Sequence, residues 1–536
     1  MTAKAPTPLT PLATAVAVMA LVAATLAVNT ASFDYGFVHD DNAVVLEREP
    51  AWEQGWLEFS KTRHWGLGRH VALLSLDLDR REPLSPRTFH LTNTALAGLV
   101  SILVWALGLA LGLGRPASLA AGLLFAVHPL HVDAVVSIVG RAELLAALAV
   151  LAVLILHLKE YPRRALSLPL AAVLFFGGLA SKESAICLLL LIAMADLAIL
   201  KPGLRKALPT YAAYAAALGL WVLWTYPALG SMAPVAYVDN PLAFAPWWQR
   251  IPMAAELLFR YVALTLWPTD LVSDRSYATL APGLASGLAA VGAWAALKAL
   301  TLSVYKKKPA LALLLLWFPV CFVATANVFF PIGTIMAERL AYLPSVGICL
   351  LAGLGLGWVS RQGRVLKAGV WTLFAVAVLT LSFGYISRAR VWTSEDHFHA
   401  QTAVDSPRSA KAHFNLGQHL ARRDRPEDAE KALARALAIY PAFDQAAYYR
   451  SALLLKLDRP YEAEGVWKSY LAYKPEDAGA LSHLLGILVS VERYDEAIPL
   501  TQRLILLVPE NNDFRSLLVR LEMMSDYQRG LEPLSP

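Results

Sequence analysis

Eleven long apolar runs constrain this chain more than any other feature of its sequence. A helix needs about 20 apolar residues to cross the hydrocarbon core of a bilayer, where only internally hydrogen-bonded structures are stable. The first run could instead be a cleavable signal peptide, although its basic n-region is a single lysine, Lys4. We therefore expect an all-α fold whose membrane part is a polytopic helical bundle of about 11 spans. The runs lie near residues 11–29, 91–113, 117–138, 142–158, 166–180, 185–200, 208–228, 284–303, 309–330, 341–359 and 368–387.

The composition agrees with a membrane protein. Apolar residues make up 57% of the chain and charged residues 16%, whereas a soluble domain carries about a quarter charged residues. The net charge of +6 comes from basic residues near the ends of the runs, so we expect no nucleic-acid partner. Three cysteines, Cys187, Cys321 and Cys349, lie in apolar runs without the spacing of metal ligands.

The basic loops predict the orientation, because short basic loops stay in the cytoplasm. The segment 251–267 decides the number of membrane spans. It is apolar but contains Glu256 and Arg260, so its crossing is ambiguous. If it crossed fully, two basic loops would lie outside; if it lies along the surface or re-enters, all four lie inside. We prefer eleven spans with a cytoplasmic N-terminus, which places 31–90, 229–283 and the C-terminal tail on the external side. The basic loops are 159–164, 201–206, 306–308 and 361–367.

A repeat with a step of 34 residues runs through the tail, which we place at residues 390–536 after a membrane domain of residues 1–389. The step is that of the tetratricopeptide (TPR) helix pair, in which small residues let two helices approach and proline ends the second one. Three repeats, about 408–441, 442–475 and 476–509, would form a small α-solenoid. The repeated positions are the prolines at 407, 441, 475 and 509 and the alanines at 429, 463 and 497.

Two adjacent carboxylates, Asp40 and Asp41, follow the first span on the predicted external side. A polar group at the membrane edge is costly, so it is usually functional or paired. Either carboxylate could act as a general base. The alternative is a helix N-cap or a solvated loop.

Further charged and polar side chains lie at the predicted external ends of the later spans. We read them as candidate ligands for the phosphate or the sugar of a lipid-linked donor, and Arg339 stands out because a guanidinium can grip a phosphate through two hydrogen bonds. Arg141–Glu143 and Lys182–Glu183 have an alternative reading as pairs that neutralise each other. The candidates are Arg69, His128, His131, Arg141, Glu143, Lys182, Glu338 and Arg339.

A metal site is the weaker alternative for His128, His131 and Asp133, because zinc sites are more compact and richer in ligands. The sequence therefore predicts no metal and no cofactor. Carboxylates early in the chain and cations late suit a transferase that uses a lipid phosphate. A carboxylate would take the proton from an acceptor hydroxyl, and a cation would stabilise the departing phosphate.

At these same residues the chain resembles the transmembrane-and-TPR-containing O-mannosyltransferase (TMTC) family and its bacterial relatives. The matching segments occur in family order along nearly the whole chain, although Arg69-His70 stands where the family often has Arg-Pro. They read HDDN at 39–42, FAVHPLHVDAVVSIVGRAELLAAL at 125–148, ASKES at 180–184, LWPTDLVSDRSY at 266–277, FFPIGTIMAERLAYLPSVG at 329–347 and AKAHFNLG at 410–417.

The resemblance implies a GT-C-like glycosyltransferase that takes a sugar, generally mannose, from a polyprenyl- or dolichyl-phosphate. Asp40 then falls on the acidic motif of the first external loop, as base or acceptor-orienting residue, with Asp41 second. The acceptor would be a protein Ser or Thr hydroxyl presented through the TPR domain. The short tail and the Ala/Leu/Arg-rich composition indicate a bacterial inner-membrane protein with a periplasmic tail; in a eukaryote the tail would be in the endoplasmic reticulum lumen.

Two other functions remain open from the sequence. The same donor chemistry could serve a lipid or surface-glycan acceptor. The chain could also be a non-enzymatic membrane-anchored TPR scaffold, although scaffolding needs no polar clusters at helix ends. A transporter fits less well, because the sequence shows no inverted repeat or pair of broken helices.

Overall fold

The computed structural model describes residues 10–55, 58–59, 68–159, 164–229, 235–277 and 283–530. Within these residues the chain is helical, and the only β-contact is an isolated bridge between Arg275 and Met336. The predicted all-α class is therefore confirmed. Two compact units are present: the membrane unit, Met1–Arg275 with Ala281–Gln401, and the repeat unit, Ser276–Leu280 with Thr402–Pro536.

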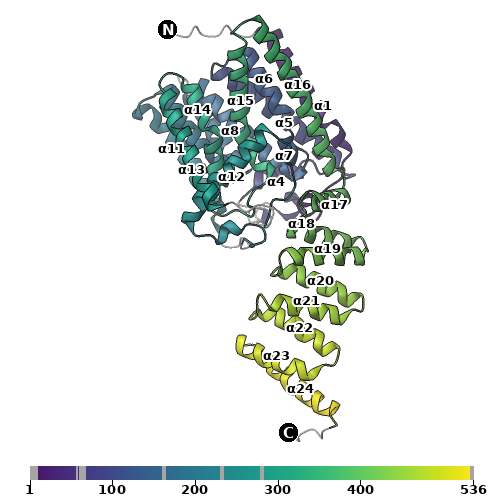
Figure 1. Ribbon diagram of the computed structural model, residues 1–536. Helices are drawn as coiled ribbons and strands as arrows, with labels where there is room; N and C mark the ends of the chain where they lie inside the picture. The colour runs from purple at the N-terminus through teal and green to yellow at the C-terminus, as the bar shows by residue number, and fades with distance from the viewer. Residues whose placement is uncertain are drawn as a thin grey trace. The chain divides into compact units, whose positions relative to one another are not determined.

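The long helices of the membrane unit follow the apolar runs (Figure 1). They are α1 (Pro11–Asn29), α5 (Pro86–Ala110), α6 (Arg115–Ala126), α8 (Arg141–Lys159), α9 (Arg164–Leu179), α10 (Leu188–Ala195), α11 (Leu204–Leu229), α12 (Trp247–Leu266), α13 (Leu284–Val304), α14 (Pro309–Phe322), α15 (Tyr342–Val359) and α16 (Arg364–Ala389). Shorter helices are α2 (Ala51–Gln54), α4 (His70–Asp77), α7 (Val132–Val135) and, after α16, α17 (Glu395–Asp405). The predicted domain boundary at residue 390 lies between α16 and α17.

Eight helical stretches among the described residues are long and apolar enough to cross a membrane. A ninth candidate is a bent pair, Arg115–Ala126 and Pro129–Val135, whose axes differ by 52°. The break occurs at Pro129, which cannot donate a helical hydrogen bond. Two more predicted runs form shorter apolar helices, Ser167–Leu179 and Pro309–Thr325. Each of the eleven runs thus forms a helix, but these last two are shorter than a full span requires.

The helix α12 contains the ambiguous segment 251–267 and is not among these candidates. Its buried face contacts the bundle through Leu257, Tyr261 and Leu264, while Trp247 and Trp248 are exposed. A helix with one polar, one aromatic and one buried face is typical of the membrane interface. Of the four basic loops used for the orientation, the first lies mostly outside the described residues.

Lipid explains the large apolar surface of the bundle. On α16 the side chains of Leu373, Leu379 and Phe383 are exposed, the last by 76%. Between helices, small residues permit close packing, as they do in membranes generally. A Cβ on Gly353 of α15 would lie 2.2 Å from the carbonyl oxygen of Ala117 on α6, so only glycine fits there.

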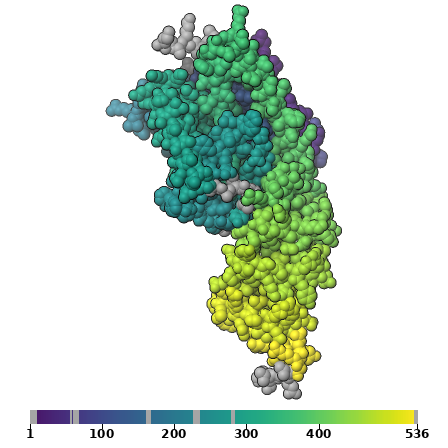
Figure 2. Space-filling view, in the orientation of Figure 1, coloured from purple at the N-terminus to yellow at the C-terminus, as the bar shows by residue number. Residues whose placement is uncertain are grey.

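The repeat unit stacks its helices in chain order, and the colour of the space-filling view changes step by step along it (Figure 2). This is expected of a solenoid, in which each pair contacts only its neighbours. The helices are α18 (Ala410–Arg422), α19 (Pro426–Ile439), α20 (Asp444–Lys456), α21 (Pro460–Leu471), α22 (Ala478–Ser490), α23 (Tyr494–Leu507) and α24 (Asn512–Gln528).

The 34-residue step also governs the turns inside the helix pairs. Asp424, Asp458 and Glu492 all adopt left-handed backbone, with φ of 55°, 58° and 59°. Each is followed by an arginine that pairs with the acidic residue three positions on, at N–O distances of 2.5–2.6 Å. The acidic residues that precede the repeated alanines therefore lie in the first turn of the second helix of each pair, where the helix dipole favours negative charge. The pairs are Arg425–Asp428, Arg459–Glu462 and Arg493–Glu496.

Two helical glycines of the repeat unit allow a matched test of this packing. A Cβ on Gly417 would lie 2.7 Å from Cγ of the buried Leu433, whereas a Cβ on Gly465 meets nothing within 4 Å. We predict that Gly465→Ala stabilises the unit by up to about 1 kcal/mol. The same change at Gly417 should be net destabilising, because overpacking costs about 1–3 kcal/mol. Protease resistance of the tail in the full-length protein measures both; equal effects would contradict the packing.

Candidate active site

The two adjacent carboxylates of the loop that follows α1 have different surroundings. Asp41 is only 1% exposed. Its Oδ1 accepts a hydrogen bond from the Val139 N–H (3.0 Å) and its Oδ2 accepts one from the Val38 N–H (3.2 Å). The side chain of Asp40 is 45% exposed, and its Oδ1 lies 3.4 Å from Nε2 of His39. Asp41 therefore holds the loop in place, whereas Asp40 can meet a substrate.

Burial dominates the ionisation of Asp41. It raises the pKa of this carboxyl to about 7, although the N–H groups of Val139 and Val38 oppose the rise. The charge on Asp40 adds to it. Asp41 therefore gains a proton near neutral pH.

Val139, whose N–H binds Asp41, belongs to the turn η4 (Ile138–Gly140). Asn93 of α5 stabilises this turn. The Asn93 side-chain amide donates to three carbonyls at the start of this turn, those of Val135, Ser137 and Ile138, at 3.1–3.2 Å. Gly140 closes the turn against α7, where a Cβ would lie 2.4 Å from the carbonyl oxygen of Ala134. The glycine of the Gly-Arg-Ala-Glu motif is therefore required sterically.

Arg141 anchors the same region from the start of α8, with no exposed side-chain surface. Its Nε donates to Asn93 Oδ1 (2.7 Å), and its two terminal nitrogens donate to the carbonyls of Ser75 (2.6 Å) and Phe89 (3.1 Å). Asp79 neutralises it at 2.6 Å. Its guanidinium thus joins α4, α5 and α8, and every nitrogen is engaged within the protein.

The two histidines of the third run have hydrogen-bonded positions in the interior. His128 donates from Nε2 to the carbonyl of Thr265 (2.8 Å), and its Nδ1 accepts the Leu130 N–H (3.2 Å). The Nδ1 of His131 is 2.8 Å from the Phe125 carbonyl, and its Nε2 is 2.8 Å from Ser345 Oγ. Both residues link the bent helix pair to neighbouring helices and present no ring nitrogen to a ligand in this arrangement.

Glu338 and Arg339 are adjacent but differently placed, in η10 (Glu338–Ala341). Glu338 is buried, where its Oε1 accepts the Val272 N–H (2.5 Å) and its Oε2 pairs with Arg388 (3.3 Å). Arg339 has a side chain that is 38% exposed and pairs with Asp133 at 3.5 Å. Asp133 also accepts the Arg339 N–H (3.2 Å). The arginine is therefore oriented by Asp133 and remains accessible.

Two cations and two glutamates form two ion pairs that feel the charge of Arg339. Arg69 makes two hydrogen bonds to Glu183, at 2.7 and 3.1 Å, and Lys182 pairs with Glu143. The positive charge of Arg339 repels both of these cations. Burial lowers the pKa of Lys182, an effect that Glu143 opposes.

Asp40 belongs to the same electrostatic group. Its carboxylate, together with those of Asp133 and Glu143, acts on the Arg339 guanidinium. Asp40 and, separately, Arg69 and Lys182 therefore lie within electrostatic range of Arg339. A carboxylate that faces a group of cations can pair proton removal with stabilisation of a phosphate.

The alternative reading of Arg141–Glu143 and Lys182–Glu183 as neutralising pairs does not match the pairing in the structure. Arg141 pairs with Asp79 rather than Glu143, and Lys182 pairs with Glu143 rather than with its neighbour Glu183. Residues one or two positions apart at a helix start do not face each other, so these side chains reach other elements.

Sequence reasoning also missed several partners, because they lie far along the chain. These are Asp79 for Arg141, Arg388 for Glu338, and Tyr261, whose hydroxyl exchanges hydrogen bonds with the backbone of Ala337 at 2.9 and 3.1 Å. The available signal was that buried charges need partners.

Comparison with known proteins agrees with this arrangement. A family described as tetratricopeptide repeat matches residues 410–443. Protein O-mannosyl-transferase TMTC3 of Mus musculus is 27% identical over 461 residues, covering 76% of this chain and 49% of the relative. TMTC4 of Homo sapiens is 29% identical over 400 residues (63% and 53%), and human TMTC1 is 26% identical over 481 residues (76% and 53%).

The curated relatives of this chain are TMTC proteins. The resemblance predicted from the motifs is therefore confirmed, and the chain spans about half the length of the TMTC relatives it matches. With its apolar helices it is an integral membrane protein that carries a TPR repeat.

The Arg141 network predicts a large stability loss. Arg141→Met leaves Asp79 and the carbonyls of Ser75 and Phe89 without their donor, and breaking a buried pair costs about 3–5 kcal/mol. The matched control is Arg87→Met, because Arg87 forms an exposed pair with Asp34, which is worth about 0–1 kcal/mol. Thermal unfolding of the purified protein in detergent measures both, and equal losses would contradict the assigned role.

The raised pKa of Asp41 predicts that the stability of the protein depends on pH. Its folded-state pKa of about 7 lies above the value of about 3.9 expected in an unfolded chain. The folded state therefore binds the extra proton, and this contribution to stability is lost as pH rises through 7. The melting temperature of the wild type relative to Asp41→Asn should be higher at pH 5 than at pH 8. A pH-independent difference would rule out a raised pKa.

Proposed function

We propose that this protein is an inverting glycosyltransferase that moves a sugar, mannose, from a polyprenyl phosphate to Ser or Thr hydroxyls of proteins. The names of the TMTC relatives, protein O-mannosyl-transferases, support the sugar and the acceptor. The half-exposed Asp40 within electrostatic reach of Arg339 carries the proposal, because this pair supplies a base and a phosphate ligand.

In the proposed reaction, Asp40 takes the proton from the acceptor hydroxyl. The hydroxyl oxygen then attacks the anomeric carbon, and the bond from that carbon to the phosphate oxygen breaks. Arg339, with Arg69 and Lys182, stabilises the negative charge that develops on the departing polyprenyl phosphate. Asp133 holds the Arg339 backbone and side chain together, so that the guanidinium is oriented before the substrate binds.

The other candidate residues support this geometry rather than contact the donor. Asp41 fixes the loop that carries Asp40, and Arg141 fixes the turn that binds Asp41. Glu338 holds the segment that carries Arg339. His128 and His131 fix the bent helix pair that carries Asp133.

We place the reaction on the external face, which is the periplasm for an inner-membrane protein of bacterial type. The basic loops support this side, because they assign the cytoplasmic face to the opposite ends of the spans. The same charge count puts the TPR tail outside, where it would bind the protein acceptor. The lipid of the donor would lie among the apolar helices.

Asp40→Asn tests the proposal. The amide keeps the size of the side chain but cannot take the proton, so transfer from polyprenyl-phosphate mannose should fall by about 10²–10⁴-fold. Asp34→Asn is the matched control, since Asp34 is an exposed carboxylate of the same loop, and it should leave the rate unchanged. Transfer to a peptide acceptor by the purified protein measures both. Full activity of Asp40→Asn would contradict the assignment of the base.

A further inference from the structure

His39 precedes Asp40 and has an unusual backbone for a histidine. Its φ of +56° lies in the left-handed region, which residues with a Cβ rarely adopt. Such strain persists only where the surroundings hold it, and it concentrates at functional sites. The turn is closed by two backbone bonds, from the Asp41 N–H to the Val38 carbonyl and from the Asn42 N–H to the His39 carbonyl, both 3.1 Å. The left-handed residue thus lies in a closed turn directly before Asp40.

The ring of His39 lies between Asp40 and α17. Its Nε2 is 3.4 Å from Asp40 Oδ1. Its face stacks on Phe398, with centroids 5.4 Å apart and planes 26° apart, and it meets His399 edge-on at 5.7 Å. The imidazole is therefore packed from one side while one nitrogen faces the carboxylate.

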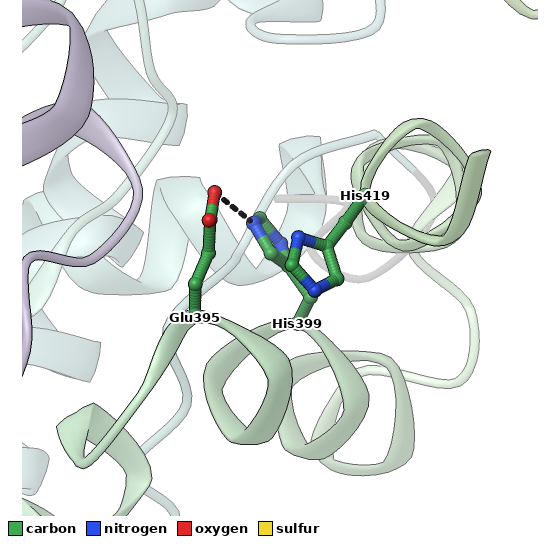
Figure 3. Close-up of side chains that lie close together, drawn as sticks. All are labelled: Glu395, His399 and His419. Carbon is green, nitrogen blue, oxygen red and sulfur yellow. Dashed lines mark ion pairs between the residues drawn. The ribbon is translucent and has the colours of Figure 1, made fainter. Parts of the chain in front are cut away.

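The residues that pack against the His39 ring have partners of their own. Phe398 is buried and packs against Trp392, with centroids 4.6 Å apart. Glu395, one turn before His399 on α17, lies 3.7 Å from the Nε2 of His399 (Figure 3). The Gly36 N–H donates to the Thr393 carbonyl at 3.2 Å, which joins the Asp40 loop directly to this segment. Residues 392–399 thus pack against the loop that carries His39 and Asp40.

We propose that His39 is the positioning residue of Asp40, and that residues 392–399 hold it in that role. Donation from the His39 ring to Oδ1 would fix the orientation of the Asp40 carboxylate toward the acceptor hydroxyl. This deepens the proposed function, on which it rests, because it names the group that orients the base. A catalytic hydrogen bond that is long in the free enzyme can tighten when the substrate binds.

Two substitutions at His39 separate orientation from folding. His39→Gly accepts the left-handed backbone and removes the ring, whereas His39→Asn also tolerates that backbone and keeps a side-chain N–H donor. We expect His39→Gly to lower kcat at least about tenfold, with the KM for polyprenyl-phosphate mannose and the melting temperature unchanged. His39→Asn should recover most of kcat. Wild-type kcat in His39→Gly, or equal losses in both variants, would overturn the proposal.

Substitution of Phe398 gives a second, independent test of the proposal. Phe398→Leu removes the stacking face and should lower kcat in the same direction, whereas Phe383→Leu on the exposed face of α16 should not. Because both changes act through one carboxylate, the double variant His39→Gly/Phe398→Leu should be no slower than His39→Gly alone. Additive losses would contradict a shared role.

A chemical measurement tests the contact without sugar transfer. Diethylpyrocarbonate modifies accessible imidazole nitrogens, and peptide mass spectrometry reports its rate at His39. We expect Asp40→Asn and Phe398→Leu each to accelerate the modification of His39 at least about twofold, since each removes a group that holds the ring. Unchanged rates in both variants would overturn the positioning role. Loss of all transfer activity in the wild type, with accelerated modification in the variants, would instead count against the proposed function alone.

Discussion

The site depends on one constraint: a guanidinium buried in the bundle needs all of its hydrogen bonds satisfied. Arg141 meets this need with carbonyls and a carboxylate from different helices, so that α4, α5 and α8 have a fixed relative position. The same Asn93 that accepts from Arg141 also donates to the turn that binds Asp41. A charge far from the reacting atoms thereby fixes the loop that carries Asp40.

The neighbouring carboxylates Asp40 and Asp41 have different roles in this arrangement. The oxygens of Asp41 are occupied by backbone N–H groups, whereas Asp40 reaches solvent beside His39. The same division separates Glu338, which is buried against Arg388, from the accessible Arg339. In both cases one residue of an adjacent pair is held by backbone or buried partners and the other is accessible, and a rigid supporting shell of this kind improves precision at a site.

The sequence predicted the parts of this protein that depend on local periodicity. Each apolar run forms a helix. The alanines at a 34-residue step are buried in the repeats, and the acidic residues before them lie in the first turn of a helix. The partners of the charges could not be predicted, since Arg141–Asp79 and Glu338–Arg388 join residues 62 and 50 positions apart. Such pairs are decided by helix packing, for which the sequence has no local signal.

The stereochemistry of transfer tests the account most directly. A single displacement, with Asp40 as base and the cation cluster on the leaving phosphate, inverts the anomeric carbon. The measurement is the anomeric configuration of mannose on a peptide product, made by the purified protein from polyprenyl-phosphate mannose of known configuration and read by nuclear magnetic resonance. The account predicts the configuration opposite to that of the donor. Retention, or the absence of any mannosylated product from an intact and folded protein, would contradict it.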